Sequence, residues 1–108
     1  MRNLTVKREK TFVGCAMSVF IYVEDEENKD EMIKGVPCRR LGSVNNNREE
    51  TFSIPNEEVK IFAIIDTLSK EWCNDMIVIP EGTEDVTISG KCKFSLFKGN
   101  PFVFNRGN

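Results

Sequence analysis

The sequence contains no histidine, and this absence excludes many catalytic and metal-binding arrangements. Serine–histidine and cysteine–histidine nucleophile pairs, and zinc sites of the His-Glu-x-x-His type, all require an imidazole. A Walker A loop and a G-x-G-x-x-G motif, two signatures of nucleotide binding, are also missing. Adjacent acidic pairs such as Glu49-Glu50 and Glu57-Glu58 lie beside predicted turns, where carboxylates are usually solvated. We therefore expect no catalytic residue, no metal and no cofactor, and a protein that is not an enzyme.

The chain also lacks a basic excess and a long apolar run. Its 15 basic and 17 acidic residues give a net charge of -2, whereas nucleic-acid-binding domains usually carry a clear positive excess. We interpret the basic cluster of Lys7, Arg8 and Lys10 as a solvated strand end, because Glu9 interrupts it. No apolar run reaches the ~20 residues that span a bilayer, and the first residues lack the apolar centre of a secretory signal. We expect no nucleic-acid partner, no membrane association and a cytoplasmic location.

Metal-binding spacings are missing as well. The four cysteines are Cys15, Cys38, Cys73 and Cys92, and no two of them form a C-x-x-C pair. We expect these cysteines to be buried and reduced, packing as small apolar side chains. Two alternatives stay open for them: disulfides if the protein is exported, and a redox or metal centre built from all four thiols. The acidic run at 24–31 lacks the calcium-loop spacing, so we predict a loop there rather than a calcium site.

Two apolar runs give the strongest strand signal. Residues 17–23 and 59–66 alternate with apolar side chains in both phases, which is typical of strands covered on both faces. Residues 50–54 alternate as well, and Pro55 follows them directly. We therefore expect the strands on either side of Pro55 to form a hairpin. Shorter strand signals lie at 3–8, 38–44, 76–79, 86–97 and 102–104.

Turn signals separate these runs throughout the chain. Together they predict one domain over residues 1–108, an all-β antiparallel two-sheet sandwich of about seven or eight short strands, immunoglobulin-like or prealbumin-like. We expect residues 32–37 to be irregular and one short helical turn near 67–74. Phe102 and Phe104 are expected to fold back onto the sheet, because exposed they would form an adhesive patch.

Two stretches resemble a known kind of domain. The run LTVKREKTFVG at residues 4–14 resembles the opening of small uncharacterised β domains of Firmicutes proteins. Residues 41–61 are similar to the L-x-x-G-x-x-x-x-F-x-V-P-x-G-x-H-x-V hairpin of those domains and of PEGA-like domains. The chain departs from this pattern at Asn47, where Gly is usual, and after Pro55, where glutamate replaces Gly and no His follows. The resemblance implies a bacterial protein with a prealbumin-like or immunoglobulin-like sandwich, and it transfers no catalytic residue.

The leading functional hypothesis is a non-catalytic interaction or accessory module that binds a protein partner, or itself, through a sheet face or edge. β-Augmentation needs only an exposed edge. The alternative is a carbohydrate-binding module in which Trp72 and Tyr22 form a stacking platform. Arg39 and Arg40 are further candidates for ligand binding, and as neighbours on a strand they are expected to point to opposite faces.

Overall fold

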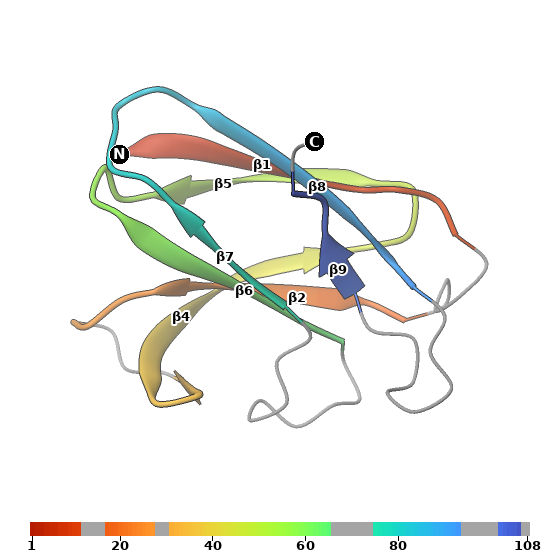
Figure 1. Cartoon of the computed structure of the whole chain (residues 1–108), viewed down its shortest axis with the longest axis horizontal. Coiled ribbons are helices and arrows are strands. Elements are labelled where there is room, and N and C mark those ends of the chain that lie inside the picture. Colours follow the sequence, from red (N-terminus) through yellow and green to blue (C-terminus); the bar gives the residue numbers. More distant parts are fainter. Residues whose placement is uncertain (12–16, 28–30, 66–74, 94–101, 107–108) are drawn as a thin grey trace.

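The computed structural model describes residues 1–11, 17–27, 31–65, 75–93 and 102–106. These residues form two sheets that pack against each other, and no helix occurs among them (Figure 1). The strands are β1 (Arg2–Arg8), β2 (Val19–Glu24), β3 (Glu31–Ile33), β4 (Val36–Val44), β5 (Glu49–Ile54), β6 (Val59–Ile65), β7 (Asp75–Ile79), β8 (Val86–Cys92) and β9 (Phe102–Phe104). The four-stranded sheet has the order β5-β1-β8-β9 and the five-stranded sheet the order β3-β4-β2-β6-β7. The predicted all-β, two-sheet sandwich is confirmed.

The two strongest sequence runs lie side by side at the centre of the five-stranded sheet. β2 and β6 are antiparallel, with Val19 opposite Ile65 and Val23 opposite Ile61. On both strands, the side chains that face the other sheet belong to the main core, which lies between the two sheets. The side chains on the opposite face belong to a second apolar group, here called the outer-face cluster. That cluster contains Tyr22, Ile33, Cys38, Phe62 and Ile64. Fully burying one such side chain stabilises a protein by about 1.5–3 kcal/mol, so strands covered on both faces, as predicted, anchor this sheet.

The four-stranded sheet supplies the opposite wall of the main core. Leu4 and Val6 of β1 are buried there together with Phe102 and Phe104 of β9. The prediction that these two phenylalanines fold back onto the sheet is confirmed. The ring of Phe102 lies directly on Gly90, where an added Cβ would stand 2.6 Å from the ring. Glycine is therefore the residue that lets β9 approach β8 this closely.

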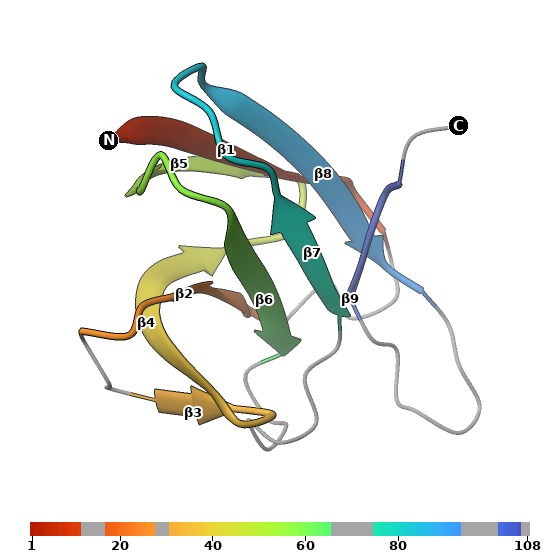
Figure 2. The same ribbon diagram turned by 60° about the vertical axis from the view of Figure 1, so that its left-hand side comes forward.

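A β-bulge in β4 turns part of this strand away from the main core. Ile21 lies opposite Gly42 but Tyr22 lies opposite Arg40, which leaves Leu41 as the extra residue. An extra residue reverses the alternation of side chains along a strand. Leu41 therefore packs on the main core while Cys38 enters the outer-face cluster. Figure 2 shows the resulting strong curvature of β4 toward β3.

The expectation that residues 32–37 are irregular is wrong. β3 and β4 form a hairpin in which Ile33 lies opposite Val36. Lys34 and Gly35 make the two-residue turn with φ angles of 51° and 80°, and two positive φ angles are typical of the type I′ turn that suits a hairpin. The sequence contains the glycine signal, but the strand before it is only 3 residues long.

The predicted hairpin around Pro55 is also wrong. β5 pairs with β1 in one sheet and β6 pairs with β2 in the other, so the chain crosses between the sheets at residues 55–58. Alternation identifies both strands correctly but does not specify their partners. The carbonyls of Pro55 and Glu57 accept hydrogen bonds of 3.1 Å and 3.2 Å from the Arg2 side chain. This buried guanidinium holds the crossing in place.

The strands β1 and β8 are parallel, which departs from the expected antiparallel pairing. Leu4 lies opposite Val86 and Arg8 opposite Gly90, while the other strand pairs are antiparallel. The antiparallel expectation assumed that paired strands are joined by short connections. Here most of the chain separates the two strands, so no crossover helix is needed.

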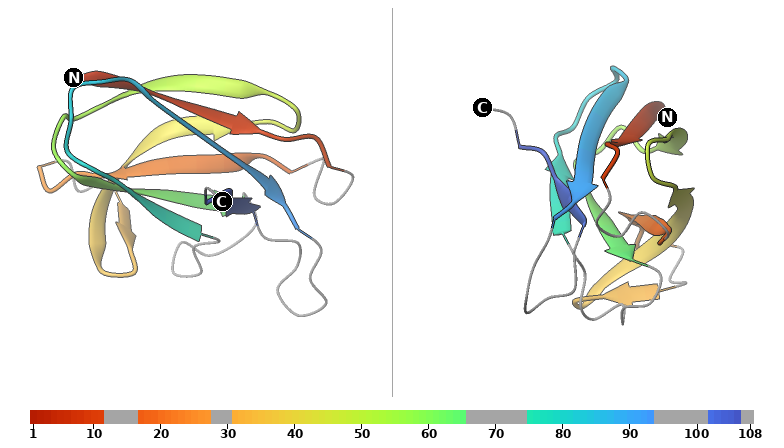
Figure 3. Two further views of the ribbon diagram at one scale, coloured as in Figure 1. Left: turned by 45° about the horizontal axis from the view of Figure 1, so that its top comes forward. Right: turned by 90° about the vertical axis from the view of Figure 1, so that its right-hand side faces the viewer.

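An arginine occupies each end of the buried face of β1. Arg2 is 5% and Arg8 is 2% exposed. The Arg8 guanidinium donates to the carbonyls of Met17 (2.6 Å) and Val44 (2.9 Å). The interpretation of Arg8 as part of a solvated strand end is therefore wrong, although Lys7 and Lys10 are exposed. The left view in Figure 3 shows β1 running along the length of the sandwich.

Some sequence predictions fall outside the described residues. These are the helical turn near 67–74, the end of the strand predicted to reach residue 97, and Cys15, Trp72 and Cys73. Cys38 and Cys92 are both buried, as predicted.

Candidate functional site

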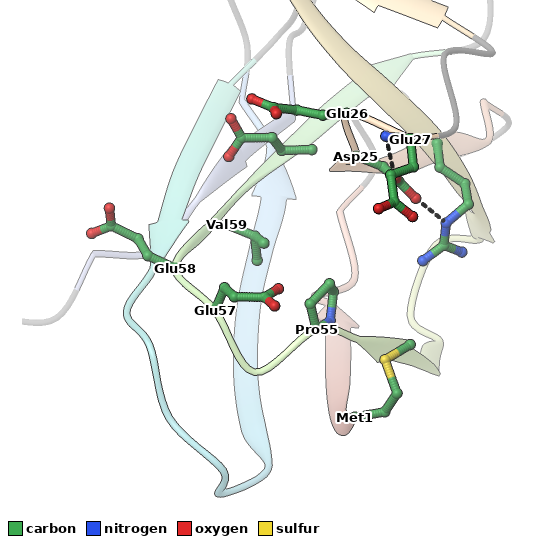
Figure 4. Close-up of a pocket in the computed structure, with 10 residues that line it drawn as sticks. Met1, Asp25, Glu26, Glu27, Pro55, Glu57, Glu58 and Val59 are labelled. Atoms are coloured by element: carbon green, nitrogen blue, oxygen red, sulfur yellow. Dashed lines mark hydrogen bonds and ion pairs between the residues drawn. The ribbon is translucent and has the colours of Figure 1, made fainter.

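An acidic cleft of about 530 Å³ opens at the end of the sandwich where β2 stops and β6 starts (Figure 4). Its carboxylates come from two segments, the one that follows β2 and the one that precedes β6. The lining residues are Met1, Glu24, Asp25, Glu26, Glu27, Arg39, Pro55, Glu57, Glu58 and Val59. The position follows from the fold, because β2 and β6 are antiparallel neighbours, so the end of β2 and the start of β6 lie at the same end of the sheet.

Several carboxylates of this cleft already have structural roles. Asp25 forms an ion pair with Arg39, with 3.1 Å between Nε and Oδ2, and its other oxygen accepts the N–H of Glu27 at 3.0 Å. Glu24 accepts the main-chain N–H of Lys60 at 3.2 Å. The Asp25 and Arg39 side chains are 25% and 29% exposed, so the pair adds at most about 1 kcal/mol.

The remaining acids give the rim of the cleft a negative potential. Glu26, Glu27, Glu57 and Glu58 are exposed, and such a rim attracts cationic groups at low ionic strength. Among the described residues, no group of three or more acidic or cysteine side chains is arranged to hold a metal ion.

The structure separates the candidate arginines. Arg39 lines the cleft, whereas the guanidinium of Arg40 stacks over the Phe20 ring, 3.7 Å from its centroid, on the outer face of the sheet. The prediction that the two side chains point to opposite faces is confirmed. Such a cation–π contact at an exposed site contributes about 0.5–1 kcal/mol.

Tyr22 belongs to the outer-face cluster on the same face of the sheet, and its side chain is only 2% exposed. A sugar-stacking platform needs an open ring face, so in this structure Tyr22 does not offer one. The carbohydrate hypothesis stays a prediction that depends on Trp72, which lies outside the described residues.

Exposed apolar side chains mark the edges of the five-stranded sheet. Val78 of β7 is 42% and Met32 of β3 is 54% exposed, and β7 and β3 are the outermost strands of this sheet. In the four-stranded sheet, the edge strand β5 instead carries the exposed acids Glu49 and Glu50. The sequence identified the strand that contains Val78, but alternation alone does not show which strand is an edge.

The other edge of the four-stranded sheet is fastened to β7. The Asp75 carboxylate accepts the Phe104 N–H at 2.8 Å and both terminal nitrogens of Arg106 at 2.7 Å and 2.8 Å. Arg106 also donates to the Met76 carbonyl at 2.6 Å. Burial acts to raise the pKa of Asp75, but the hydrogen bonds from Arg106, Phe104 and Met76 outweigh it, so the pKa lies below its usual value. Sequence reasoning missed this contact because the two charged residues lie far apart in the chain.

No protein-family model matches the chain, and a search of curated proteins found no matching relative. What is shown is therefore a small all-β domain of two sheets. Within the described part of the chain, no helix has the length and apolar character needed to cross a membrane.

Proposed function

We propose that this domain is a non-catalytic interaction module whose β7 edge binds an extended segment of a protein partner or of a second copy. The observation that carries the proposal is Val78, a large apolar side chain that is 42% exposed on an outermost strand. Exposed strand edges are templates for pairing with another chain, and natural proteins usually protect them with charge or bulges. Val78 is not protected in this way.

The main chain of β7 supports this edge as the binding surface. Along a strand, alternate residues direct their N–H and C=O groups to the same side. The Met76 carbonyl accepts a hydrogen bond from Arg106, which lies beyond the outer side of β7. Val78, two residues further on, therefore presents its own N–H and C=O toward the same side. An incoming strand extends the ladder from this point.

Side chains next to this edge define what kind of segment fits. Ile77 is partly buried against the main core, whereas Val78 lies on the opposite face of the sheet. A paired segment would place alternate side chains beside these two residues. The partner is thus an extended stretch with apolar side chains on both faces, of the kind recognised in β-augmentation.

The other edges are less suited to this role. β5 carries two exposed glutamates, β9 is held against β7 through Asp75, and β3 has only 3 residues. β7 has 5 residues.

Substitution of Val78 by lysine tests the proposal. Val78→Lys places a charge on the edge, and Thr87→Lys, on the exposed face of β8, adds the same charge elsewhere as a matched control. We expect a protein captured from extracts of the source cells, or a dimer seen by sedimentation at high concentration, to be lost with Val78→Lys and kept with Thr87→Lys. A monomer at every concentration, together with identical captured proteins for both variants, would contradict the proposal.

The membership in a Firmicutes or PEGA-like β-domain family, the immunoglobulin-like or prealbumin-like subclass and a cytoplasmic setting belong to this proposal too. The two-sheet architecture supports the sandwich subclass alone. The separation of β5 and β6 into different sheets counts against the hairpin on which part of the resemblance depends.

A further inference from the structure

Residues 102–106 lie between β8 and β7, in what is here called the β8–β7 groove, in the manner of a bound peptide. β9 pairs with β8, with Phe102 opposite Cys92 and Phe104 opposite Gly90. On its other side the segment reaches β7 of the five-stranded sheet. Figure 2 shows β9 at the periphery of the fold, next to β8 and β7.

Two aromatic side chains anchor the segment. Phe102 is fully buried and Phe104 is 2% exposed, and their rings meet edge to face with centroids 5.3 Å apart. The Phe102 ring packs directly against Gly90, so any side chain at position 90 would overlap the ring. Alternate anchors in pockets, combined with main-chain pairing, are the features of a strand-recognition site.

Polar contacts fix the direction and register of the segment. Arg106 and Asp75 form a two-pronged ion pair, and the Phe104 N–H donates to the same carboxylate. The Asn105 N–H donates to the Ser89 carbonyl at 2.8 Å, and the Asn105 side chain donates to Ser89 and Glu9. All these partners lie on other strands or on the residue that follows β1.

We infer that this groove also accepts residues 102–106 of a second copy, which gives a dimer with exchanged β9 strands. In an exchanged dimer the contacts of this segment with β7, β8 and Glu9 are reproduced between copies, so exchange requires no new complementary surface. The Asp75–Arg106 pair supplies charge complementarity for the incoming segment. This inference goes beyond the proposed function, because it uses the groove between β8 and β7 and not the free edge at Val78.

A charge-reversal pair tests the exchange directly. Asp75→Arg and Arg106→Asp each place like charges in contact within one chain. When the two variants are mixed, only exchange between copies restores two opposite-charge pairs. Native mass spectrometry of a 1:1 mixture is expected to show roughly tenfold more heterodimer than homodimer of either variant alone. The double variant Asp75→Arg/Arg106→Asp restores the pair within one chain and is expected to behave like the original protein.

The unaltered chain provides the second measurement. After incubation near its unfolding midpoint at high concentration, we expect a dimer that persists on dilution, because separation requires β9 to leave its groove. We also expect Val78→Lys to leave this dimer unchanged, which separates the exchange from association through the β7 edge. A mixture without excess heterodimer, together with an unaltered chain that forms no persistent dimer, would overturn the inference.

Discussion

The guanidinium of Arg8 contacts the thiol of Cys92 inside the core, with 3.6 Å between Nη2 and Sγ. The same guanidinium donates hydrogen bonds to the main-chain carbonyls of Met17 and Val44. One buried cation thus connects the end of β1 to the start of the β2 segment, the end of β4 and the end of β8. At the other end of β1, Arg2 connects the β5–β6 crossing to the Pro80 carbonyl, which lies 2.7 Å from its nitrogen.

Replacing Arg8 by methionine should strongly destabilise the domain. Arg8→Met keeps most of the side-chain volume but leaves the buried Val44 carbonyl and the partly buried Met17 carbonyl without their donor. Leaving a buried carbonyl unpaired costs about 1–3 kcal/mol, and a partly buried one less. Urea unfolding followed by circular dichroism should show a free energy of unfolding lowered by roughly 2–4 kcal/mol. Lys10→Met, at an exposed position, is the control and should change it by less than about 0.5 kcal/mol. Equal effects of both substitutions would refute the structural role of Arg8.

The Cys92 thiol should react slowly in the folded protein. Burial raises its pKa, and the charge and hydrogen bond of Arg8 only partly oppose this effect. Because the thiolate is the reactive form, peptide mapping after iodoacetamide treatment at neutral pH should show little modification of Cys92 until urea unfolds the chain. Modification at the same rate with and without urea would contradict the buried position.

Gly90 should tolerate a methyl group poorly. In Gly90→Ala the new Cβ meets both the Phe102 ring and the Val103 carbonyl at 2.6 Å, and such overpacking costs about 1–3 kcal/mol. Gly35→Ala serves as a comparison, because that position has open space and only its positive φ opposes a side chain. The strain at Gly35 is about 1–2 kcal/mol. Adding Phe102→Leu should reduce the loss of thermal stability at position 90 and leave the loss at position 35 unchanged.

Asp75 should make stability depend on pH in the acidic range. Its pKa is lower in the folded than in the unfolded chain, so its contribution is complete above the unfolded value of about 3.9 and disappears as the pH falls through the folded value. At pH 7, Asp75→Asn should lower the free energy of unfolding by about 1–3 kcal/mol. Below about pH 4 the difference from the original chain should shrink. A difference that is constant across this range would show that Asp75 acts only through its shape.

The alternation of apolar residues was sufficient to predict the strands and their buried phases. β2 and β6 have the expected two-sided burial because nearly every residue in each is apolar, which only a doubly covered strand accommodates. Phe102 and Phe104 were placed correctly for a related reason, since two large rings at alternate positions require a core.

Features that depend on several distant segments were not predictable in this way. Arg2 is buried because carbonyls from two separate connections converge on it, and no local pattern indicates that convergence. The partner of β5 was assigned wrongly because alternation is equally compatible with either sheet. Asp75 and Arg106 meet only once β7 and β9 have joined different sheets, and Val78 becomes an edge residue only in the completed strand order.

Site-specific photo-crosslinking in the source cells tests the binding edge most directly. A photoreactive amino acid at position 78 should give a discrete crosslinked species that contains this chain and an extended segment of a partner or second copy. The same amino acid at position 87, on the exposed face of β8, should give none. Crosslinks of equal yield from both positions, or none from position 78, would contradict a binding site at the edge of β7.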